Sequence, residues 1–299
     1  MKTWAIAVCA LLLAAPAAAE QQTRAPRVIH PALYVVRDHN STIYLFGTIH
    51  VRPQGQPWGG PEAQSALASA DEIWTELEIS PEAEARSAPT AQQLGLAPAN
   101  RQLSTWLTPE ENQRLNAVTT QLGLPTGALE RMQPWLASIS LTIVTGMRAG
   151  YDPNSGVDRD IDAYGDAHHK TMRWFETAEQ QFGFLAHLSD DQQHEILLDS
   201  IDESEKGAAM LQEMTDDWER GDVDALQKLV VDDTREDYPE LYDVILRRRN
   251  AAWIPVIQQE LRGSGVDFIA VGAGHLLGPD GLVALLRARG LHVERVRPQ

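Results

Sequence analysis

The sequence has 299 residues, of which 43% are hydrophobic, with 25 Lys and Arg against 42 Asp and Glu and a formal net charge of −17. A chain of this length and composition can bury a substantial core, which argues against a disordered, collagen-like or coiled-coil protein. The acidic excess argues against nucleic acid as a partner, because such binding depends on clustered Lys and Arg.

The first nineteen residues have the features of a signal peptide. Lys2 supplies the positive start, an apolar run follows, and Ala17–Ala19 form a small-residue cleavage site. We expect cleavage after Ala19, a flexible segment over 20–29 and a single domain over 30–299, in a periplasmic or secreted protein. No later apolar run reaches the roughly 18 residues of a membrane span, so no transmembrane anchor is expected. Cys9 is the only cysteine, so the mature chain would have no disulfide and no cysteine ligand.

The N-terminal part of the domain predicts strands and one short helix. Two strands, over 32–36 and 41–46, are separated by a turn and are expected to form a hairpin. A helix over 61–70 leads to a strand over 72–79. Because side chains alternate along a strand, Trp74, Glu76 and Glu78 are expected on one face of it.

The middle of the chain is mainly helical by pattern. Thr108 begins a capping box, and a second helix is expected over 134–148. The remaining helices are expected over 156–170, 189–219 and 241–261, with a short strand over 171–175.

The C-terminal part predicts a strand over 267–271, a helix over 279–289 and a strand over 291–296. Strands therefore occur mostly near the two ends, and helices fill the middle. One sheet must be assembled from distant segments, which indicates an α/β protein with a large helical middle region.

One local pattern occurs twice. Four apolar strand residues, a glycine, two small or apolar residues and a histidine are found at 43–50 and again at 268–275. The glycines Gly47 and Gly272 allow a sharp turn and a close ligand approach, and Gly274 adds to this in the second copy. If the two strands are close in the sheet, His50 and His275 converge on one pocket.

A metal site is the functional interpretation of this pattern. Glu76 is the natural third ligand, and two histidines with a carboxylate suit a hydrolytic zinc, manganese or cobalt centre. Glu78, on the same strand face, is a candidate general base or a group that orients a ligand, and Glu176 is a further candidate at a strand end.

Simpler interpretations exist for each residue. The histidines can be loop residues that bond a carbonyl, the glutamates a solvated strand face, and the glycines turn residues. The run of glycines at 272–278 also has a partial likeness to a dinucleotide-binding loop, but its third glycine is one place late. The zinc-protease helix motif and the serine-hydrolase elbow are both absent from the sequence.

The chain resembles the TraB/PrgY/GumN family, whose extracellular animal relatives are the Tiki metalloproteases. The resemblance covers most of the chain, from about His30 to Val296. It rests on segments that keep their order and spacing: 44–51, 74–78, 156–158, 175–181, 249–250 and 271–278 with Gly281.

The resemblance implies a single domain with a central mixed sheet flanked by helices, similar to ChaN-like and erythromycin-esterase-like proteins. It also implies that His50, His275 and Glu76 form a metal-dependent active centre. Glu176, Arg249 and Asn250 would support it, with Asp158 in a further matching segment. Arg249 would stabilise an oxyanion or bind a substrate carboxylate.

Two classes of function follow as hypotheses. The first is an exported metal-dependent hydrolase, a peptidase, that acts on a peptide or small-molecule substrate. The second is a binding protein without turnover that holds a metal, haem or a peptide in the same pocket. A role as an accessory protein for surface polysaccharide is suggested only by the GumN name. The sequence does not indicate an oligomeric state.

Overall fold

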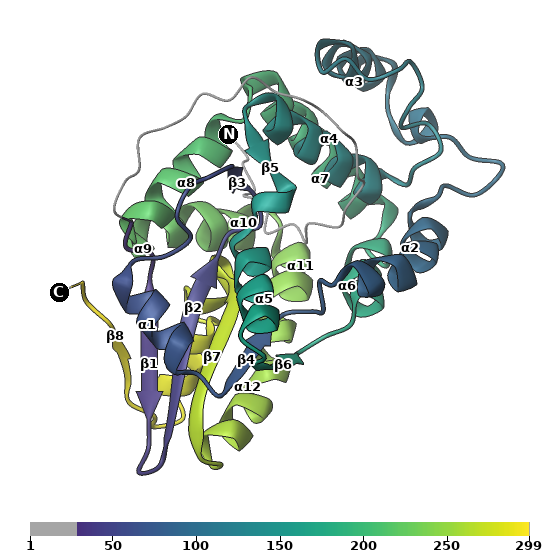
Figure 1. Cartoon of the computed structure of the whole chain (residues 1–299). Coiled ribbons are helices and arrows are strands. Elements are labelled where there is room, and N and C mark those ends of the chain that lie inside the picture. The colour runs from purple at the N-terminus through teal and green to yellow at the C-terminus, as the bar shows by residue number, and fades with distance from the viewer. Residues whose placement is uncertain (1–28, 299) are drawn as a thin grey trace.

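A six-stranded mixed sheet forms the centre of the structure, a computed structural model that describes residues 29–298 (Figure 1). The expected signal peptide and all but residue 29 of the segment 20–29 lie outside the described residues. In sheet order the strands are β6 (Thr171–Trp174), β4 (Glu72–Thr75), β7 (Gly265–Gly272), β2 (Ser41–Thr48), β1 (Leu33–Arg37) and β8 (Val293–Arg295).

The sheet joins both ends of the described chain. β1 and β2 form the expected antiparallel hairpin, and β8 pairs antiparallel with β1. The other neighbours, β2 with β7, β7 with β4, and β4 with β6, are all parallel. The carboxyl ends of four parallel strands therefore meet at one edge of the sheet, where ligand sites of α/β proteins are usually found. A separate two-stranded sheet pairs β3 (Arg52–Pro53) with β5 (Tyr151–Asp152).

Helices cover both faces of the sheet. α1 (Pro61–Ser69) contacts β7, and α5 (Val157–Ala167) contacts β4, β6 and β7; both lie in front of the sheet in Figure 1. α12 (Arg248–Leu261) contacts β2 and lies behind the sheet, while α13 (Leu282–Arg287) contacts β8. β1, β2 and β7, in the middle of the sheet, are mostly buried because helices pack against both faces, whereas the edge strands β6 and β8 are largely exposed.

The remaining helices form the large middle region. They are α2 (Pro81–Gly95), α3 (Pro109–Gln121), α4 (Pro134–Arg148), α6 (Ala178–Ala186), α7 (Asp190–Lys206), α8 (Ala209–Arg220), α9 (Val223–Leu226), α10 (Asp233–Asp237) and α11 (Pro239–Tyr242). Short 3₁₀ turns occur at η1 (Leu103–Trp106), η2 (Pro153–Ser155) and η5 (Ala273–Leu276), and π-helical turns at η3 (Gln227–Asp232) and η4 (Asp243–Arg247).

Two apolar clusters stabilise the described part of the chain. The larger includes apolar side chains of the sheet, of the helices that cover its two faces, and of the segment from Leu226 to Leu261. The smaller includes Leu115 and Val118 of α3, Leu141 of α4 and Leu197 of α7. α3 thus packs on the helical middle region and lies away from the sheet (Figure 1). Within the described residues, no helix combines the length and the apolar character that a membrane span requires.

Several local predictions are confirmed. Thr108 caps α3 in a full capping box, and α4 has the bounds that the sequence predicted. The expected helix over 189–219 is wrong, because the chain breaks between α7 and α8. Gly207 (φ 74°) and Ala208 (φ 64°) are both left-handed there, which a continuous helix does not allow.

The strand over 72–79 is also shorter than predicted. β4 ends at Thr75, because the Gly272 N–H of the neighbouring strand donates to the side chain of Glu76, at 2.7 Å from Oε1. Glu76 and Leu77 form a bend, and the alternation that placed Glu78 beside Glu76 does not extend this far.

Candidate active site

The two histidine motifs lie side by side at the carboxyl edge of the sheet. β2 and β7 are neighbouring parallel strands, and Thr48 is in register with Gly272. Both strands end at this point, so His50 and His275 follow them into the same region. The prediction of a shared pocket required that the two strands lie close together in the sheet, and β2 and β7 are indeed neighbours.

Gly272 lies between three of the predicted site residues. A methyl group at its α-carbon would lie 3.2 Å from Glu76 Oε1, 3.5 Å from His50 Nε2 and 3.7 Å from a carbon of the His275 ring. The side chains of Glu76, His50 and His275 thus converge on one point, which is open only because residue 272 has no side chain.

Glu76 is buried and ionised. Burial alone would raise the pKa of its carboxyl group, but Arg249 and the Gly272 N–H hold that pKa well below its usual value. Glu76 Oε1 accepts the Gly272 N–H and lies 3.7 Å from His275 Nε2.

Arg249 of α12 connects two carboxylates that arrive from different strands. Its Nη2 donates to Glu76 Oε2 at 2.5 Å and to Glu176 Oε2 at 2.7 Å, and its Nε donates to Glu176 Oε1 at 2.9 Å. Its Nη1 donates to the Ile245 carbonyl, in the π-helical turn η4, and faces His275 Nε2 at 3.0 Å. The two carboxylates of Glu76 and Glu176 face one guanidinium, so this buried group carries one excess negative charge.

His275 has a defined orientation. Its Nδ1 lies 2.6 Å from Asn250 Oδ1, and its ring packs against Trp253 at a centroid distance of 4.5 Å. Arg249 can only donate, so His275 Nε2 accepts and Nδ1 carries the proton. Burial lowers the pKa of His275 to about 3, with Arg249 acting in the same direction. The imidazole is therefore neutral, and the lone pair of its Nε2 faces Arg249 Nη1.

His50 is oriented by the start of α5. The Val157 N–H donates to the Ile49 carbonyl at 2.9 Å, and the Asp158 carboxylate lies 3.4 Å from His50 Nδ1. At Gly156 any side chain would lie 2.6 Å from the His50 carbonyl, so only glycine fits. Burial lowers the pKa of His50, but Asp158 more than offsets this and raises it above its usual value.

Three of the predicted residues, Glu78, Gly47 and Gly274, are neither among the side chains that converge at Gly272 nor among the side chains that bond to them. Glu78 accepts from Ser80 at 3.0 Å and from Arg86 at 2.6 Å, and its side chain is 32% exposed. Gly47 allows β2 to approach Ala273, whose α-carbon would lie 3.0 Å from an added Cβ. Gly274 allows a similarly close contact with Val230. The two glycines thus serve packing of the site's backbone.

The sequence matches the TraB/PrgY/gumN family over residues 32–295. The chain belongs to the TraB/PrgY/gumN family. Neither the curated proteins nor the solved structures gave a significant match. The mixed six-stranded sheet flanked by helices confirms the fold class that this family resemblance implied.

The segments that carried the TraB/PrgY/gumN resemblance are the ones that the fold brings together. The segments 44–51 and 271–278 provide the two histidines, 74–78 provides Glu76, and 249–250 provides the Arg and Asn that contact them. The segments 156–158 and 175–181 provide the contacts to His50 and to Arg249.

The donor set suits a divalent ion in chemistry but not in spacing. Among the described residues, Glu72, Glu260 and Asp267 are the group of potential ligands whose atoms all lie within 4.8 Å of one another, so His50, His275 and Glu76 would have to move closer together to hold one ion. His50, His275 and Glu76 offer nitrogen and oxygen donors of the kind that zinc, manganese and cobalt bind. The excess of negative charge in the buried group would be balanced by such an ion. For His275 Nε2 to bind it, Arg249 Nη1 would have to release its 3.0 Å contact with that atom.

Two residues of the network were not singled out from the sequence. Gln181 Nε2 donates to Glu176 at 3.0 Å, and Trp253 Nε1 donates to the same carboxylate at 3.0 Å. Gln181 lies within a segment that matched the family, but a glutamine or a tryptophan in a helix has no sequence pattern that separates it from ordinary packing.

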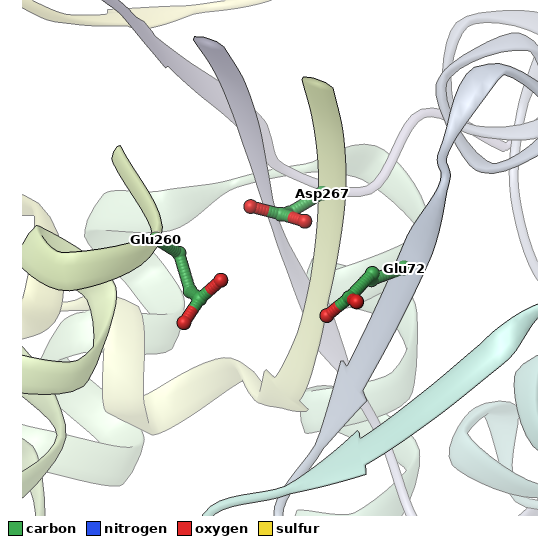
Figure 2. A group of neighbouring side chains, drawn as sticks. All are labelled: Glu72, Glu260 and Asp267. Atoms are coloured by element: carbon green, nitrogen blue, oxygen red, sulfur yellow. The ribbon is translucent and has the colours of Figure 1, made fainter. Parts of the chain in front are cut away.

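An acidic group at the opposite edge of the sheet was also missed. Glu72 of β4, Asp267 of β7 and Glu260 of α12 have carboxylate oxygens within 4.8 Å of one another (Figure 2). The register that pairs Glu72 with Asp267 could not be read from the sequence. Glu72 is also paired with Arg173, so this group is a local electrostatic feature of the strands' amino ends.

Proposed function

We propose that the protein is an exported metal-dependent hydrolase that cleaves peptide bonds. The observation that supports this most strongly is the convergence of His50, Glu76 and His275 around Gly272, at the carboxyl edge of the sheet. A neutral imidazole with a fixed lone pair and a buried, ionised carboxylate are what a hydrolytic metal centre requires.

In this proposal His50, His275 and Glu76 hold the ion. A bound zinc, manganese or cobalt ion would polarise the scissile carbonyl and lower the pKa of a water molecule. Asn250 and Trp253 hold the His275 ring in place, and Asp158 holds His50. Arg249 holds the carboxylates of Glu76 and Glu176, and all five of its N–H groups have partners within the protein.

The proton carrier and the oxyanion donor remain predictions. Glu176 is held by Arg249 and Trp253, and Glu78 by Arg86 and Ser80. A role for Glu176 or Glu78 in proton transfer, or for Arg249 in binding an oxyanion, requires that the group leave these contacts when substrate binds.

Peptide hydrolysis by substituted proteins tests the proposal. Purified protein supplied with zinc, manganese or cobalt is assayed on a mixed peptide library by mass spectrometry, beside His50→Ala and His275→Ala. We expect each substitution to reduce cleavage by more than about 100-fold, beyond the usual effect of a residue that only supports a ligand.

His39→Ala is the matched control, because the side chain of His39 is 87% exposed and lies in the turn between β1 and β2. Its cleavage rate should equal that of the unsubstituted protein. Cleavage that is unchanged in His50→Ala or His275→Ala would overturn the assignment.

A binding protein without turnover is the second candidate. It is favoured by the contacts of Arg249, which satisfy both Glu76 and His275 without any ligand. Titration with haem distinguishes its haem form: a Soret band that is lost in His50→Ala would support binding, and the absence of a band would exclude that form.

A further inference from the structure

An apolar cavity adjoins the candidate active site. It offers about 100 Å³ to the centre of a water molecule, several times the roughly 10–15 Å³ that one water needs. Its walls come from the ends of β2 and β7, from the second halves of α4 and α7, and from α8. Most of the wall is carbon, from residues that include Ile49, Ile143, Met147, Met210, Leu211 and Met214.

The cavity and the metal-type donors share two residues. His50 and Gly272 both line the cavity, and both also border the point on which Glu76 and His275 converge. One ligand could therefore occupy the cavity and the candidate active site at the same time. A substrate whose scissile bond lies at His50 would extend one of its substituents into this space.

The walls select against charge. The lining residues include no Lys or Arg, and the acidic Glu203 is already paired with Lys206 at 2.8 Å. The hydroxyl groups of Thr145 and Ser204 bond each other at 2.7 Å and so are not free for a ligand. The Thr48 hydroxyl, which has no hydrogen-bond partner among the described residues, and the His50 imidazole are among the few polar groups left to a charged substituent, whereas an apolar one would gain from burial along most of the wall.

The three methionines determine what shape can enter. Met147, Met210 and Met214 are partly exposed and unbranched, and their side chains adapt to ligands of different outline. A pocket with such walls accepts several apolar side chains of similar size better than it selects a single one.

We propose that this cavity is the specificity pocket of the enzyme and takes an uncharged, apolar amino-acid side chain, such as Leu, Met or Phe, next to the bond that is cleaved. The proposal rests on the proposed function, since it assigns the substrate class of that same site.

The test uses peptides that differ at one position. Peptides of the form acetyl-Ala-Ala-X-Ala-Ala-amide, with X as Ala, Leu, Met, Phe, Asp or Lys, are assayed for cleavage with metal present. The same peptides are assayed for binding by calorimetry with a chelator present, so that binding is measured without turnover. We expect Leu, Met and Phe to exceed Ala by at least about tenfold in both measurements, because one methylene in an apolar pocket is worth that much.

Substitutions of the wall show whether the cavity causes the preference. Met214→Trp fills the space and should reduce the preference for Leu over Ala by about tenfold. Met214→Ala enlarges the space and should shift the preference from Leu towards Phe; it keeps the test valid if the larger residue prevents folding. Met132→Ala is the matched control, since Met132 is a partly buried methionine of the smaller apolar cluster and does not line the cavity.

Each result separates this proposal from the proposed function. Apolar preference in binding that depends on Met214, without cleavage, would support the pocket and overturn the hydrolase. Cleavage without apolar preference, or with a preference that Met214 substitutions leave unchanged, would overturn the pocket and leave the hydrolase standing. Absence of both binding and cleavage for every peptide would overturn both.

Discussion

Arg249 is the residue on which the geometry of the site depends most. It is buried and holds Glu76 and Glu176, which are both ionic partners at less than 3 Å. Replacing it leaves two carboxylates without their cation in a region with little water, and breaking a buried pair in this way costs about 3–5 kcal/mol.

We therefore expect Arg249→Ala to reduce the free energy of unfolding by about 3–5 kcal/mol, measured by urea denaturation. Arg249→Lys should recover only part of this, because an ammonium group cannot bond both carboxylates in the same planar arrangement. Arg114→Ala is the control: Arg114 pairs with Asp202 and Glu205 at the surface, where the loss should be at most about 1 kcal/mol. Equal losses at the two arginines would contradict the role given to Arg249.

A substitution of Gly272 should affect the activity of the site much more than the stability of the protein. Its backbone angles, φ −48° and ψ 137°, are open to any residue, so Gly272→Ala should change the free energy of unfolding by less than about 1 kcal/mol. The added methyl group would occupy the point between Glu76, His50 and His275. Cleavage of peptides should fall by at least tenfold in this variant.

Gly183→Ala is the matched control for this substitution, because an added methyl group there meets His187 only at an ordinary distance of 3.5 Å. It should retain full activity. A Gly272→Ala protein as active as the Gly183→Ala protein would show that the point between the three side chains is not used in the reaction.

At the scale of elements, the parallel strands create opposite electrostatic conditions at their two ends. The carboxyl ends carry the paired network of Arg249, whereas the amino ends bring Asp267 together with Glu72 and Glu260 (Figure 2). Burial, followed by the charges of Glu260, Glu72 and Asp71, raises the pKa of Asp267 to about 7. The folded state thus binds a proton that the unfolded state releases at lower pH.

This arrangement predicts a pH-dependent effect on stability. Because the pKa of Asp267 is higher in the folded state, protonation of its carboxyl group stabilises the folded protein. This stabilisation is complete below about pH 4 and is lost as the pH rises through about 7. Asp267→Asn does not ionise, so it should be more stable than the unsubstituted protein by about 1–2 kcal/mol at pH 8, with the gain disappearing near pH 4. Urea denaturation at the two pH values measures this. A variant that is equally or less stable at pH 8 would contradict the repulsion.

At the scale of the whole molecule, features that local sequence patterns determine could be predicted, whereas most long-range contacts could not. The two histidine motifs and Glu76 were predicted because each is written in consecutive residues at a strand end. The contact of Arg249 with Glu76 joins residues 173 positions apart, and only the resemblance to the family pointed to it. No spacing rule connects α12 to β4, because their contact depends on how the sheet is assembled.

The incorrect predictions have the same physical origin. β4 stops at Thr75 because the Glu76 side chain accepts from Gly272, 196 positions away, which the alternation in 72–79 could not indicate. The break at Gly207 did have a local sign, since glycine is the usual left-handed residue at a helix end, but the acidic pattern continued across it. Glu78 was placed beside Glu76 through the first of these errors.

The most direct test of the account is the metal content of the protein, purified without chelator and measured by mass spectrometry. The variants His50→Ala, His275→Ala and the control His39→Ala are measured beside it, with circular dichroism to confirm equal folding. We predict near-stoichiometric zinc, manganese or cobalt in the unsubstituted protein and in His39→Ala, and its loss in both other variants. No bound metal, even after each ion has been added, would contradict the central claim.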